Sequence, residues 1–201
     1  MNLALFDFDG TITHSDTFTA FIKGAVSARR QRWGRLVLAP SVMGYRMGLV
    51  EATTIRQRLI KFAFKDVTSA SLEVLGRDHA ENYLPTVLRA EAAERIQWHK
   101  QRGDRIVVVS ASLEVYLKPW CEAMGVELIA VQLETVDGRL TGNYVDGDCT
   151  GLAKAERVKS YLDLSDYGKV FAYGDTAEDH ALLALADRKF YRGRELTKLR
   201  A

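Results

Sequence analysis

The sequence predicts an α/β protein with a Rossmann-like, mostly parallel sheet, helices on both faces of it, and an inserted helical domain. Two observations lead to this prediction. Short apolar segments rich in β-branched residues alternate with amphipathic segments in the second half of the chain. Residues 15–88, which follow the first apolar segment, show only helical spacing. We therefore expect a core of residues 1–13 and 89–201 and an inserted helical domain of residues 14–88.

The bulk properties are those of an ordinary globular protein. The chain has 201 residues, 47% hydrophobic and 27% charged, which is enough for one good core and a small second lobe. A formal net charge of +2 gives no reason to expect a nucleic-acid partner. Cys121 and Cys149 fit neither a disulfide framework nor a paired-cysteine metal site. With no export signal and no apolar run of about 20 residues, we expect a cytoplasmic protein.

The first strand and the helices that follow it are read directly from the apolar pattern. Residues 3–8, LALFDF, predict a buried strand that ends in the turn Asp9-Gly10-Thr11. Apolar residues then recur at three- and four-residue spacing, as in Phe18, Phe21 and Ile22. We expect Pro40 and Gly44 to break this helical stretch internally.

The second half of the chain returns to alternating elements. A run of β-branched residues ending at Ser110 predicts a strand, and Asp137-Gly138 predicts a hairpin turn. The expected elements are helices at 91–102, 116–124, 151–162 and 177–186, strands at 105–110, 126–131 and 170–173, hairpin strands at 133–136 and 139–142, and a short last strand at 190–191.

Chemically informative residues fall where the predicted strands end. In open α/β sheets, ligands bind at the carboxyl ends of the strands. Asp7 and Asp9 follow the first strand, Ser110 ends the second, and Asp175 follows the strand at 170–173. Converging carboxylates invite a hard cation, and a few of them with water and a substrate phosphate suit Mg²⁺. Lys154 and the serine hydroxyl would supply the positive potential and donors that a phosphate needs.

Four segments resemble, in order, the motifs of haloacid dehalogenase-like phosphatases. They are Asp7-Phe8-Asp9-Gly10-Thr11, Ser110 within VVVSAS, Lys154, and the run from Gly174 to Asp179. The helical insert and the segment 140–154 are similar to the phosphoserine-phosphatase-like branch, subfamily IB. This resemblance implies that residues 14–88 form a cap of the C1 type over a catalytic core of residues 1–13 and 89–201. The last motif departs from many relatives, which carry Gly and Asn-Asp where this chain has Thr176 and Glu178-Asp179.

The resemblance implies a role for each motif residue. Asp7 would attack phosphorus and form a phospho-aspartate, and Asp9 would protonate the leaving alcohol and then activate water. Mg²⁺ would be bound by Asp7, by Asp9 through its backbone carbonyl, and by Asp175. The remaining implied roles are phosphate contacts from Thr11, Ser110 and the neighbouring Ala111, charge neutralisation by Lys154, and support of Lys154 or of a metal-bound water by Asp179.

Substrate choice is expected to reside in the cap. Asp16 lies where the similar branch often has an acid that reads a substrate amine, and Arg58 aligns with an arginine that holds the carboxylate of phosphoserine. A solvated helix face is the alternative for Arg58. The roles of Glu178 and His14 stay open, and His79 and His99 are expected on helix surfaces.

A basic and apolar segment of the cap favours a different substrate. Arg29, Arg30, Arg32 and Arg35 surround Trp33 and lead into an apolar run, a combination that suits peripheral contact with the inner face of an anionic membrane. This part resembles the cap of phosphatidylglycerophosphatases. Packing against neighbouring helices or a second subunit is the alternative, and the oligomeric state stays open.

The sequence therefore predicts a magnesium-dependent phosphomonoester hydrolase. Its substrate would be a phosphoserine-like small phosphate, a sugar or polyol phosphate, or a phosphatidylglycerophosphate-like lipid phosphate. Two rivals remain: a phosphotransferase or mutase that uses the same aspartyl-phosphate, and a catalytically silent binding protein at the membrane surface.

Overall fold

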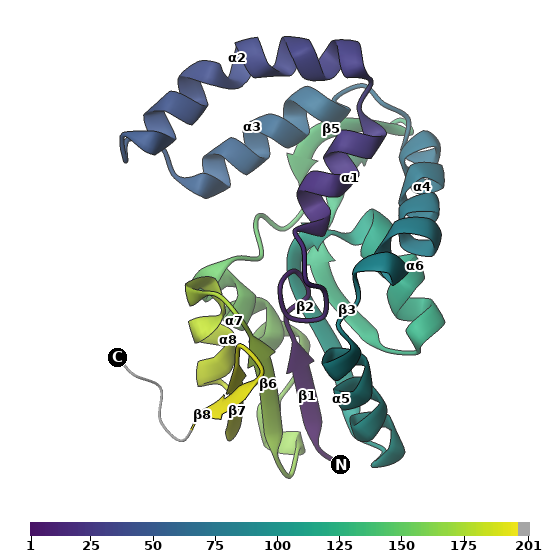
Figure 1. The fold of residues 1–201 in the computed structure, drawn as a ribbon, viewed down its shortest axis with the longest axis vertical. Helices are drawn as coiled ribbons and strands as arrows, with labels where there is room; N and C mark the ends of the chain where they lie inside the picture. The colour runs from purple at the N-terminus through teal and green to yellow at the C-terminus, as the bar shows by residue number, and fades with distance from the viewer. Residues whose placement is uncertain (197–201) are drawn as a thin grey trace.

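The computed structural model describes residues 1–196, and within them it holds two sheets. The main sheet has six strands in the order β3-β2-β1-β6-β7-β8 (Figure 1). All neighbours in it are parallel except β7 and β8. The strands are β1 (Leu3–Phe6), β2 (Arg105–Leu113), β3 (Glu127–Val131), β6 (Val170–Gly174), β7 (Arg188–Tyr191) and β8 (Arg194–Leu196). The prediction of a mostly parallel, Rossmann-like sheet is confirmed.

The first strand, β1, was easy to predict because it lies in the middle of the sheet. All four of its side chains are buried, and it is flanked by β2 and β6. A strand covered on both faces shows a continuous apolar run rather than alternation. The run LALF therefore forms the middle of the sheet and leaves Asp7 directly at its carboxyl end.

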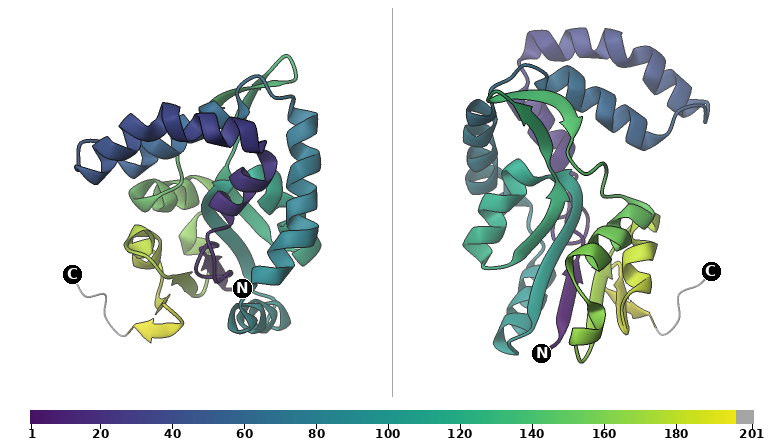
Figure 2. Two further views of the ribbon diagram at one scale, coloured as in Figure 1. Left: turned by 45° about the horizontal axis from the view of Figure 1, so that its top comes forward. Right: turned by 180° about the vertical axis from the view of Figure 1, so that it is seen from behind.

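Helices cover both faces of the sheet (Figures 1 and 2). The chain moves from β1 to β2 and β3 in one direction and then to β6 and β7 in the other, so right-handed crossovers place the two sets of connecting helices on opposite faces. The helices are α5 (Ala90–Gln101), α6 (Glu114–Met124), α7 (Gly151–Tyr161) and α8 (His180–Ala184), with short 3₁₀ turns η3 (Leu164–Asp166) and η4 (Ala177–Asp179).

The segment between β1 and α5 is entirely helical among its named elements and forms an upper lobe (Figure 1). Side chains of Asp16, Ser27 and Thr68 cap three of its helices by accepting a backbone N–H. The elements are α1 (Thr17–Ala25), α2 (Ala28–Arg46), α3 (Ala52–Phe64), α4 (Ser69–Asp78), the π-turn η1 (His79–Tyr83) and the 3₁₀ turn η2 (Leu84–Val87).

The predicted hairpin forms the second sheet and joins this upper lobe. It consists of β4 (Leu133–Val136) and β5 (Arg139–Tyr144), connected by Asp137-Gly138 with φ of +50° and +74°. The backbone of Leu140 pairs with that of Asp66 and Val67, just after α3. A side chain at Gly142 would lie 2.8 Å from the Cα of Lys61, so glycine permits the close approach. The predicted division into residues 14–88 and the rest stays a prediction, to which the hairpin adds a segment packed on α3.

Two local expectations were wrong, and one strand was missed. Helix α2 continues through Pro40 and Gly44, because a proline removes only one backbone bond and Gly34 packs α2 against Phe62 of α3. Strand β2 runs past Ser110 to Leu113. The antiparallel edge strand β8 was missed, since its three residues carry too short a pattern. No helix among the described residues is long and apolar enough to cross a membrane.

His99 was expected on a helix surface and is instead fully buried in α5. Its Nδ1 lies 2.8 Å from Asp104 Oδ2 and its Nε2 lies 2.9 Å from the Tyr173 hydroxyl. Burial lowers its pKa, although Asp104 opposes this. Asp104 also accepts a hydrogen bond from Asn2 at 2.8 Å. The network ties α5 to the strands beneath it and lies outside the motif residues.

Candidate active site

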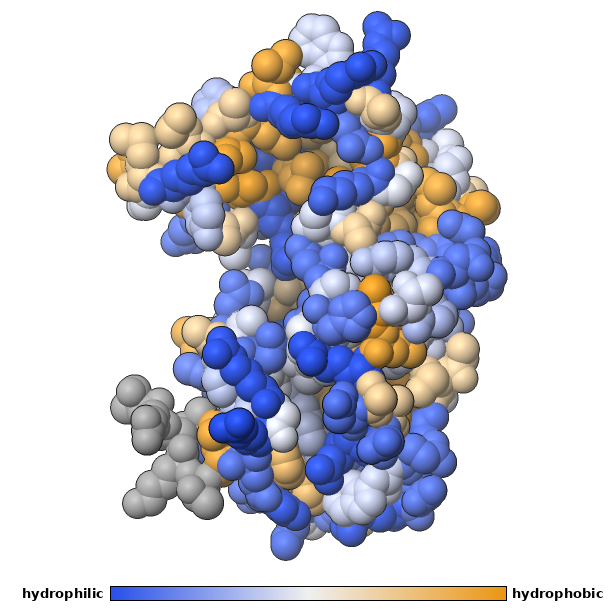
Figure 3. Space-filling view, viewed as in Figure 1, coloured by the Kyte–Doolittle hydropathy of each residue, from blue (hydrophilic) through white to orange (hydrophobic). Residues whose placement is uncertain are grey.

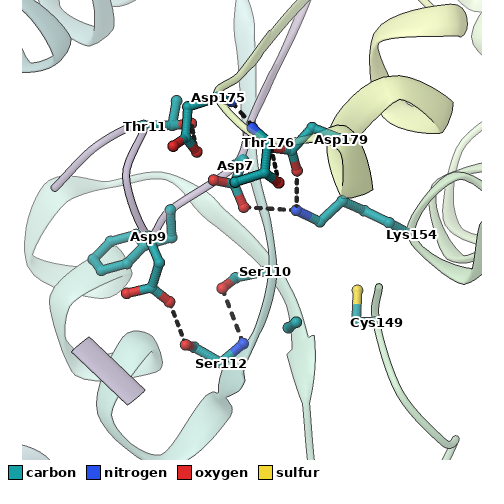
Figure 4. Close-up of polar contacts among 12 residues, drawn as sticks. Asp7, Asp9, Thr11, Ser110, Ser112, Cys149, Lys154, Asp175, Thr176 and Asp179 are labelled. Atoms are coloured by element: carbon teal, nitrogen blue, oxygen red, sulfur yellow. Dashed lines mark hydrogen bonds and ion pairs between the residues drawn. The ribbon is translucent and has the colours of Figure 1, made fainter. Parts of the chain in front are cut away.

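The carboxyl ends of three neighbouring strands bring the predicted motif residues together (Figure 4). Asp7 follows β1, Ser110 lies in β2, and Asp175 follows β6. Because β1 lies between β2 and β6, these three positions share one edge of the sheet. Helix α7 brings Lys154 to the same edge from one face of the sheet.

Lys154 joins two carboxylates at the centre of the site. Its Nζ donates to Asp7 Oδ1 and to Asp179 Oδ1, each at 2.6 Å. All three side chains are buried, with exposed fractions of 9% or less. Although burial opposes a charged amine, Asp7 and Asp179 raise the pKa of Lys154 above its usual value. Lys154 is therefore a fixed cation held directly beside Asp7.

The positive charge of Lys154 does not fully offset the cost of burying the Asp7 carboxylate. Burial raises its pKa to about 7, with Lys154 opposing the shift and Asp179 adding to it. One lysine thus serves two buried carboxylates. A further cation beside Asp7 would favour its ionised form, which is the form that can attack phosphorus.

Asp175 lies next to Asp7 and is held from the first-motif loop. Thr11 Oγ1 donates to Asp175 Oδ1 at 3.3 Å. Gly10 has φ of +87°, and any side chain there would overlap the Asp175 carboxylate. Burial and the charge of Asp179 raise the pKa of Asp175. The close approach of the two loops explains why glycine is needed between Asp9 and Thr11.

These acids fit a hard divalent cation. Asp7, Asp175 and Asp179 each offer a carboxylate oxygen, and the three oxygens lie within 4.8 Å of one another. The carboxylate of Asp179 is already occupied by Lys154 and by the N–H groups of Asp175 and Thr176. Asp7 and Asp175 therefore have the free oxygens, and oxygen-only ligands with elevated pKa values suit Mg²⁺.

Asp179 is held by several donors beside Lys154, and its predicted supporting role stays a prediction. Its Oδ2 accepts from the backbone N–H groups of Asp175 and Thr176, each at 3.0 Å, and from Thr176 Oγ1 at 3.1 Å. Despite burial, Lys154 and these N–H groups lower its pKa below the usual value. Thr176, the departure from the family pattern, thus takes part in a capping box. Glu178 is exposed, as is His14.

Asp9 points away from this cluster (Figure 4) and is hydrogen-bonded to Thr17 at the start of α1. Its Oδ1 accepts from the Thr17 backbone at 2.7 Å and from the Thr17 hydroxyl at 2.5 Å. Its Oδ2 accepts a short bond from Ser112. Burial raises the pKa of Asp9, with Ser112 and Thr17 opposing the shift. A buried carboxyl with a raised pKa can carry a proton, which suits an acid–base role better than a side-chain metal ligand.

Ser112 is a site residue that the sequence analysis missed. It lies two residues after Ser110 on β2, and its N–H donates to Ser110 Oγ at 3.0 Å. Both serines are buried. Alternation along a strand places residues i and i+2 on the same face, so the spacing in VVVSAS could have identified it. Ser110 itself lies near Asp9 and Asp7 (Figure 4), and its contact with phosphate stays a prediction.

The two predicted substrate residues of the cap make contacts within the helical lobe, and their roles toward a substrate stay predictions. Asp16 is exposed and caps α1 by accepting from the N–H of Thr19 at 2.9 Å. Arg58 is exposed and donates to Ser41 of α2 at 2.7 Å.

Arg56 is the cap arginine that reaches the catalytic core. Its Nη1 donates to the Ala111 carbonyl at 3.2 Å, and its guanidinium lies 4.5 Å from the ring centroid of Phe18. The Tyr144 hydroxyl of β5 is buried and has no recorded hydrogen-bond partner among the described residues. Burial raises the pKa of Tyr144, and the nearby Arg56 charge opposes the shift. Arg56 and Tyr144 thus bring a cation and a free hydroxyl to the boundary between lobe and core.

Two further arginines hold the motif loops from outside. Arg89 Nε donates to the carbonyls of Gly10 and Thr13, each at 3.0 Å. Arg192 Nε donates to the Asp175 carbonyl at 2.9 Å. Both line a cavity of about 580 Å³ that reaches Asp175. Neither arginine could be predicted from the sequence, because each donates its hydrogen bonds to backbone carbonyls of a segment distant in the chain.

A doubly wound sheet with acids, a serine and a buried lysine at its carboxyl edge defines an α/β enzyme built for phosphate chemistry. The chain belongs to the haloacid dehalogenase-like hydrolases, whose sequence profile matches residues 4–184. The proteins that it resembles include a histidinol-phosphatase and, in fold, phosphoserine phosphatases.

Two curated relatives cover nearly the whole chain. Protein CicA of Caulobacter vibrioides is 34% identical over 196 residues, which is 94% of this chain and 85% of CicA. A histidinol-phosphatase of Neisseria meningitidis is 29% identical over 204 residues, which is 92% of this chain and 86% of that protein.

Solved structures share the fold at lower identity. A Bordetella pertussis protein of unknown function has a TM-score of 0.78 at 24% identity, covering 94% of this chain and 88% of that one. A substrate-bound phosphoserine phosphatase has a TM-score of 0.62 at 20% identity, covering 94% of this chain and 85% of that one.

Proposed function

We propose that this hydrolase is a Mg²⁺-dependent phosphomonoester hydrolase that works through a phospho-aspartate on Asp7. The observation that carries the proposal is Lys154, buried and hydrogen-bonded at 2.6 Å to both Asp7 and Asp179. Such a cation neutralises charge on the attacking carboxylate and on the incoming phosphoryl group. If Lys154 served only as a structural ion pair, nothing would explain why Asp7 and Asp175 keep free carboxylate oxygens at the same edge of the sheet.

In the first step, a carboxylate oxygen of Asp7 attacks phosphorus in line with the ester oxygen. The bond from phosphorus to the ester oxygen breaks as the new bond to Asp7 forms. Asp9 gives its proton to the leaving oxygen, so the alcohol departs neutral. The pKa of Asp9, raised by burial, favours the protonated form that this step uses.

In the second step, the now ionised Asp9 takes a proton from a water molecule that attacks the phosphoryl group. The bond from phosphorus to Asp7 breaks, which releases inorganic phosphate and restores both carboxyl groups. Thr17 and Ser112 hold Asp9 throughout, and Thr17 is the first residue of α1. The acid–base group is thereby linked to the start of the helical lobe.

Asp7, the Asp9 backbone carbonyl and Asp175 would hold Mg²⁺, which supplies Lewis-acid polarisation of the phosphoryl oxygens when bound. Ser110 and Thr11 lie at the same edge and would donate hydrogen bonds to the phosphoryl oxygens. Lys154 keeps the nucleophile oriented, and Asp179 keeps Lys154 in place.

For the substrate we propose a small phosphate monoester whose leaving group is read by Arg56 and Tyr144. Arg56 contacts Ala111, next to Ser110, and Tyr144 offers a buried hydroxyl close to it. A cation and a free hydroxyl would recognise an anionic or polar group on the leaving alcohol. The relatives named for histidinol phosphate and phosphoserine support a small polar substrate, while a lipid phosphate stays open because of the apolar surface of α2.

The test is phosphate release from a panel that contains phosphoserine, histidinol phosphate, sugar phosphates and phosphatidylglycerophosphate in mixed micelles. We expect turnover that is abolished by EDTA and restored by Mg²⁺, and acid-quenched enzyme that carries a hydroxylamine-sensitive phosphoryl group. Release of phosphate to an added alcohol in preference to water would instead identify a phosphotransferase. Absence of turnover on every substrate by folded, Mg²⁺-supplied protein would contradict the proposal and favour a binding protein.

A further inference from the structure

Helix α2 has one face that packs on the protein and one that does not. Gly34 and Ser41 are buried against α3, and a side chain at Gly34 would lie 2.7 Å from the ring of Phe62. Arg30 Nε donates to the Phe62 carbonyl at 3.0 Å. These contacts fix the rotation of α2 about its axis, so the direction of its opposite face is determined as well.

The opposite face carries an apolar stripe along the helix. Its members recur at spacings of three and four residues, which places them on one side of an α-helix. All are exposed, with exposed fractions of 59% for Trp33, 70% for Leu36, 58% for Met43 and 65% for Met47. The stripe consists of Trp33, Leu36, Pro40, Met43 and Met47. Figure 3 shows orange residues mixed with blue ones on this lobe.

Arginines flank this stripe without acidic partners. On a helix with 100° per residue, Arg32, Arg35 and Arg46 fall on one side of the stripe and Arg29 lies at its start. None of the four has a recorded hydrogen bond or ion pair to a described side chain. Residues 28–50 contain no Asp or Glu at all. Such a surface is both apolar and strongly cationic.

From this face we propose that α2 docks flat on an anionic lipid surface, with the apolar stripe in the interface and the arginines at the headgroups. A helix with an exposed apolar stripe, a tryptophan and an arginine-rich polar side binds in this way. A second copy of the chain is a poorer occupant. Packing two α2 stripes together would bring the arginine rows of both copies close, with no carboxylate on either helix to neutralise them.

Docking through this face leaves the active site open. Helix α3 lies between α2 and the notch that separates the upper lobe from the lobe of β6–β8 (Figures 1 and 3). The outward stripe of α2 therefore points away from that notch. The lipid surface would attach and orient the enzyme, and attachment does not require that the substrate itself be a lipid.

The experiment is co-sedimentation of the full chain with vesicles of phosphatidylcholine alone or mixed with phosphatidylserine. Phosphatidylserine is a phosphodiester, so retention cannot come from the phosphomonoester site. We expect binding only to the anionic vesicles, weakened by high salt, with a blue shift of Trp33 emission. L36S/M43S should reduce partition by at least about tenfold, and R32Q/R35Q by roughly 30-fold.

Matched controls remove equally exposed residues elsewhere. V74S/L152S deletes side chains that are 65% and 76% exposed, and R77Q/R194Q deletes two exposed arginines. Both controls should bind vesicles like the wild type, and all variants should hydrolyse 4-nitrophenyl phosphate at the wild-type rate. The proposal is overturned if the wild type does not sediment with anionic vesicles, or if L36S/M43S binds them equally well. It is also overturned if sedimentation velocity shows a dimer that L36S/M43S loses while vesicle binding is absent.

Discussion

The carboxyl edge of the main sheet and the helix pair α2–α3 differ in whether their charged side chains are paired within the protein. At the sheet edge, Lys154 is buried and hydrogen-bonded to two carboxylates. On α2, the arginines of the outward face are exposed and have no recorded side-chain partner. Buried charges must be paired within the protein, whereas exposed ones are available for something outside it. The sheet edge is therefore suited to catalysis, and the α2–α3 pair is suited to contact with a partner outside the protein and to substrate selection.

Asp7→Asn is the change with the largest expected effect, because it tests the chemical role of the sheet edge directly. The amide keeps the shape of the side chain but cannot attack phosphorus. We expect kcat for the best phosphate ester to fall by at least about 10⁴-fold. The melting temperature should stay the same or rise, because a buried carboxylate with an elevated pKa is removed.

The control for this variant is Asp163→Asn, which changes an exposed aspartate far from the motifs. It should retain wild-type activity. Residual activity of Asp7→Asn within about tenfold of wild type, after mass spectrometry excludes deamidation, would contradict the assignment of Asp7 as nucleophile.

The sequence predicted the sheet edge well for a definite physical reason. Asp7 and Asp175 follow buried strands directly, and parallel strands place such residues at one edge whatever the details of packing. The position of Lys154 follows from the helix that precedes β6. Ser112 could also have been found from strand alternation, but Arg89 and Arg192 act through backbone carbonyls that no pattern reveals.

The helical lobe was predicted less well because helix rotation decides which side chains face the site. Arg56 and Arg58 lie two residues apart on α3, which separates their directions by about 200°. The apolar spacing predicted helical structure across this segment but did not fix the rotation of α3. The structure turns Arg56 toward Ala111 and Arg58 toward Ser41 of α2.

Ser112→Ala is expected to have the next largest effect, since it removes a hydrogen bond to the acid–base carboxylate. Hydrogen bonds to charged groups contribute about 1.5–3 kcal/mol, so kcat should fall by roughly 10- to 100-fold with little change in KM. Steady-state kinetics on the best substrate provide the measurement. Ser112→Thr keeps the hydroxyl and should restore much of the activity. Equal loss in both variants would point to packing rather than to the hydrogen bond.

Arg56→Gln and Arg58→Gln test the substrate role of the helical lobe by comparison within one helix. We expect Arg56→Gln to raise KM for the best polar substrate about tenfold or more, because a charge-assisted contact is lost. Hydrolysis of 4-nitrophenyl phosphate should change much less. Arg58→Gln should stay within about twofold of wild type on both substrates. The opposite ranking would restore the role that family resemblance assigns to Arg58.

The smallest effect concerns His99, which lies below the sheet edge and makes no contact with the motif residues. Its folded-state pKa is lowered by burial, whereas an unfolded histidine has a pKa near about 6.5. The unfolded chain therefore binds a proton more readily below that pH. The contribution of His99 to stability should be full above about pH 6.5 and should decline as the pH falls toward its folded-state pKa, by at most about 1.4 kcal/mol per pH unit. Asp7, whose pKa burial raises to about 7, contributes in the opposite direction.

Urea unfolding from pH 7.5 to 5 measures this slope, and His99→Gln separates its source. Asp104 stays ionised through the window, because His99, Asn2 and Arg102 hold its pKa low despite burial. Glutamine can still bond to Asp104 or Tyr173 but does not titrate, so the variant should be less stable at pH 7.5 and show a shallower decline.

An unchanged slope would contradict this role of His99 and would point to another group whose pKa is lowered by burial, such as His79. The carboxyl groups of Asp7, Asp9 and Asp175 cannot be that source, because their raised folded-state pKa values make the folded chain bind protons more readily and so stabilise it as the pH falls.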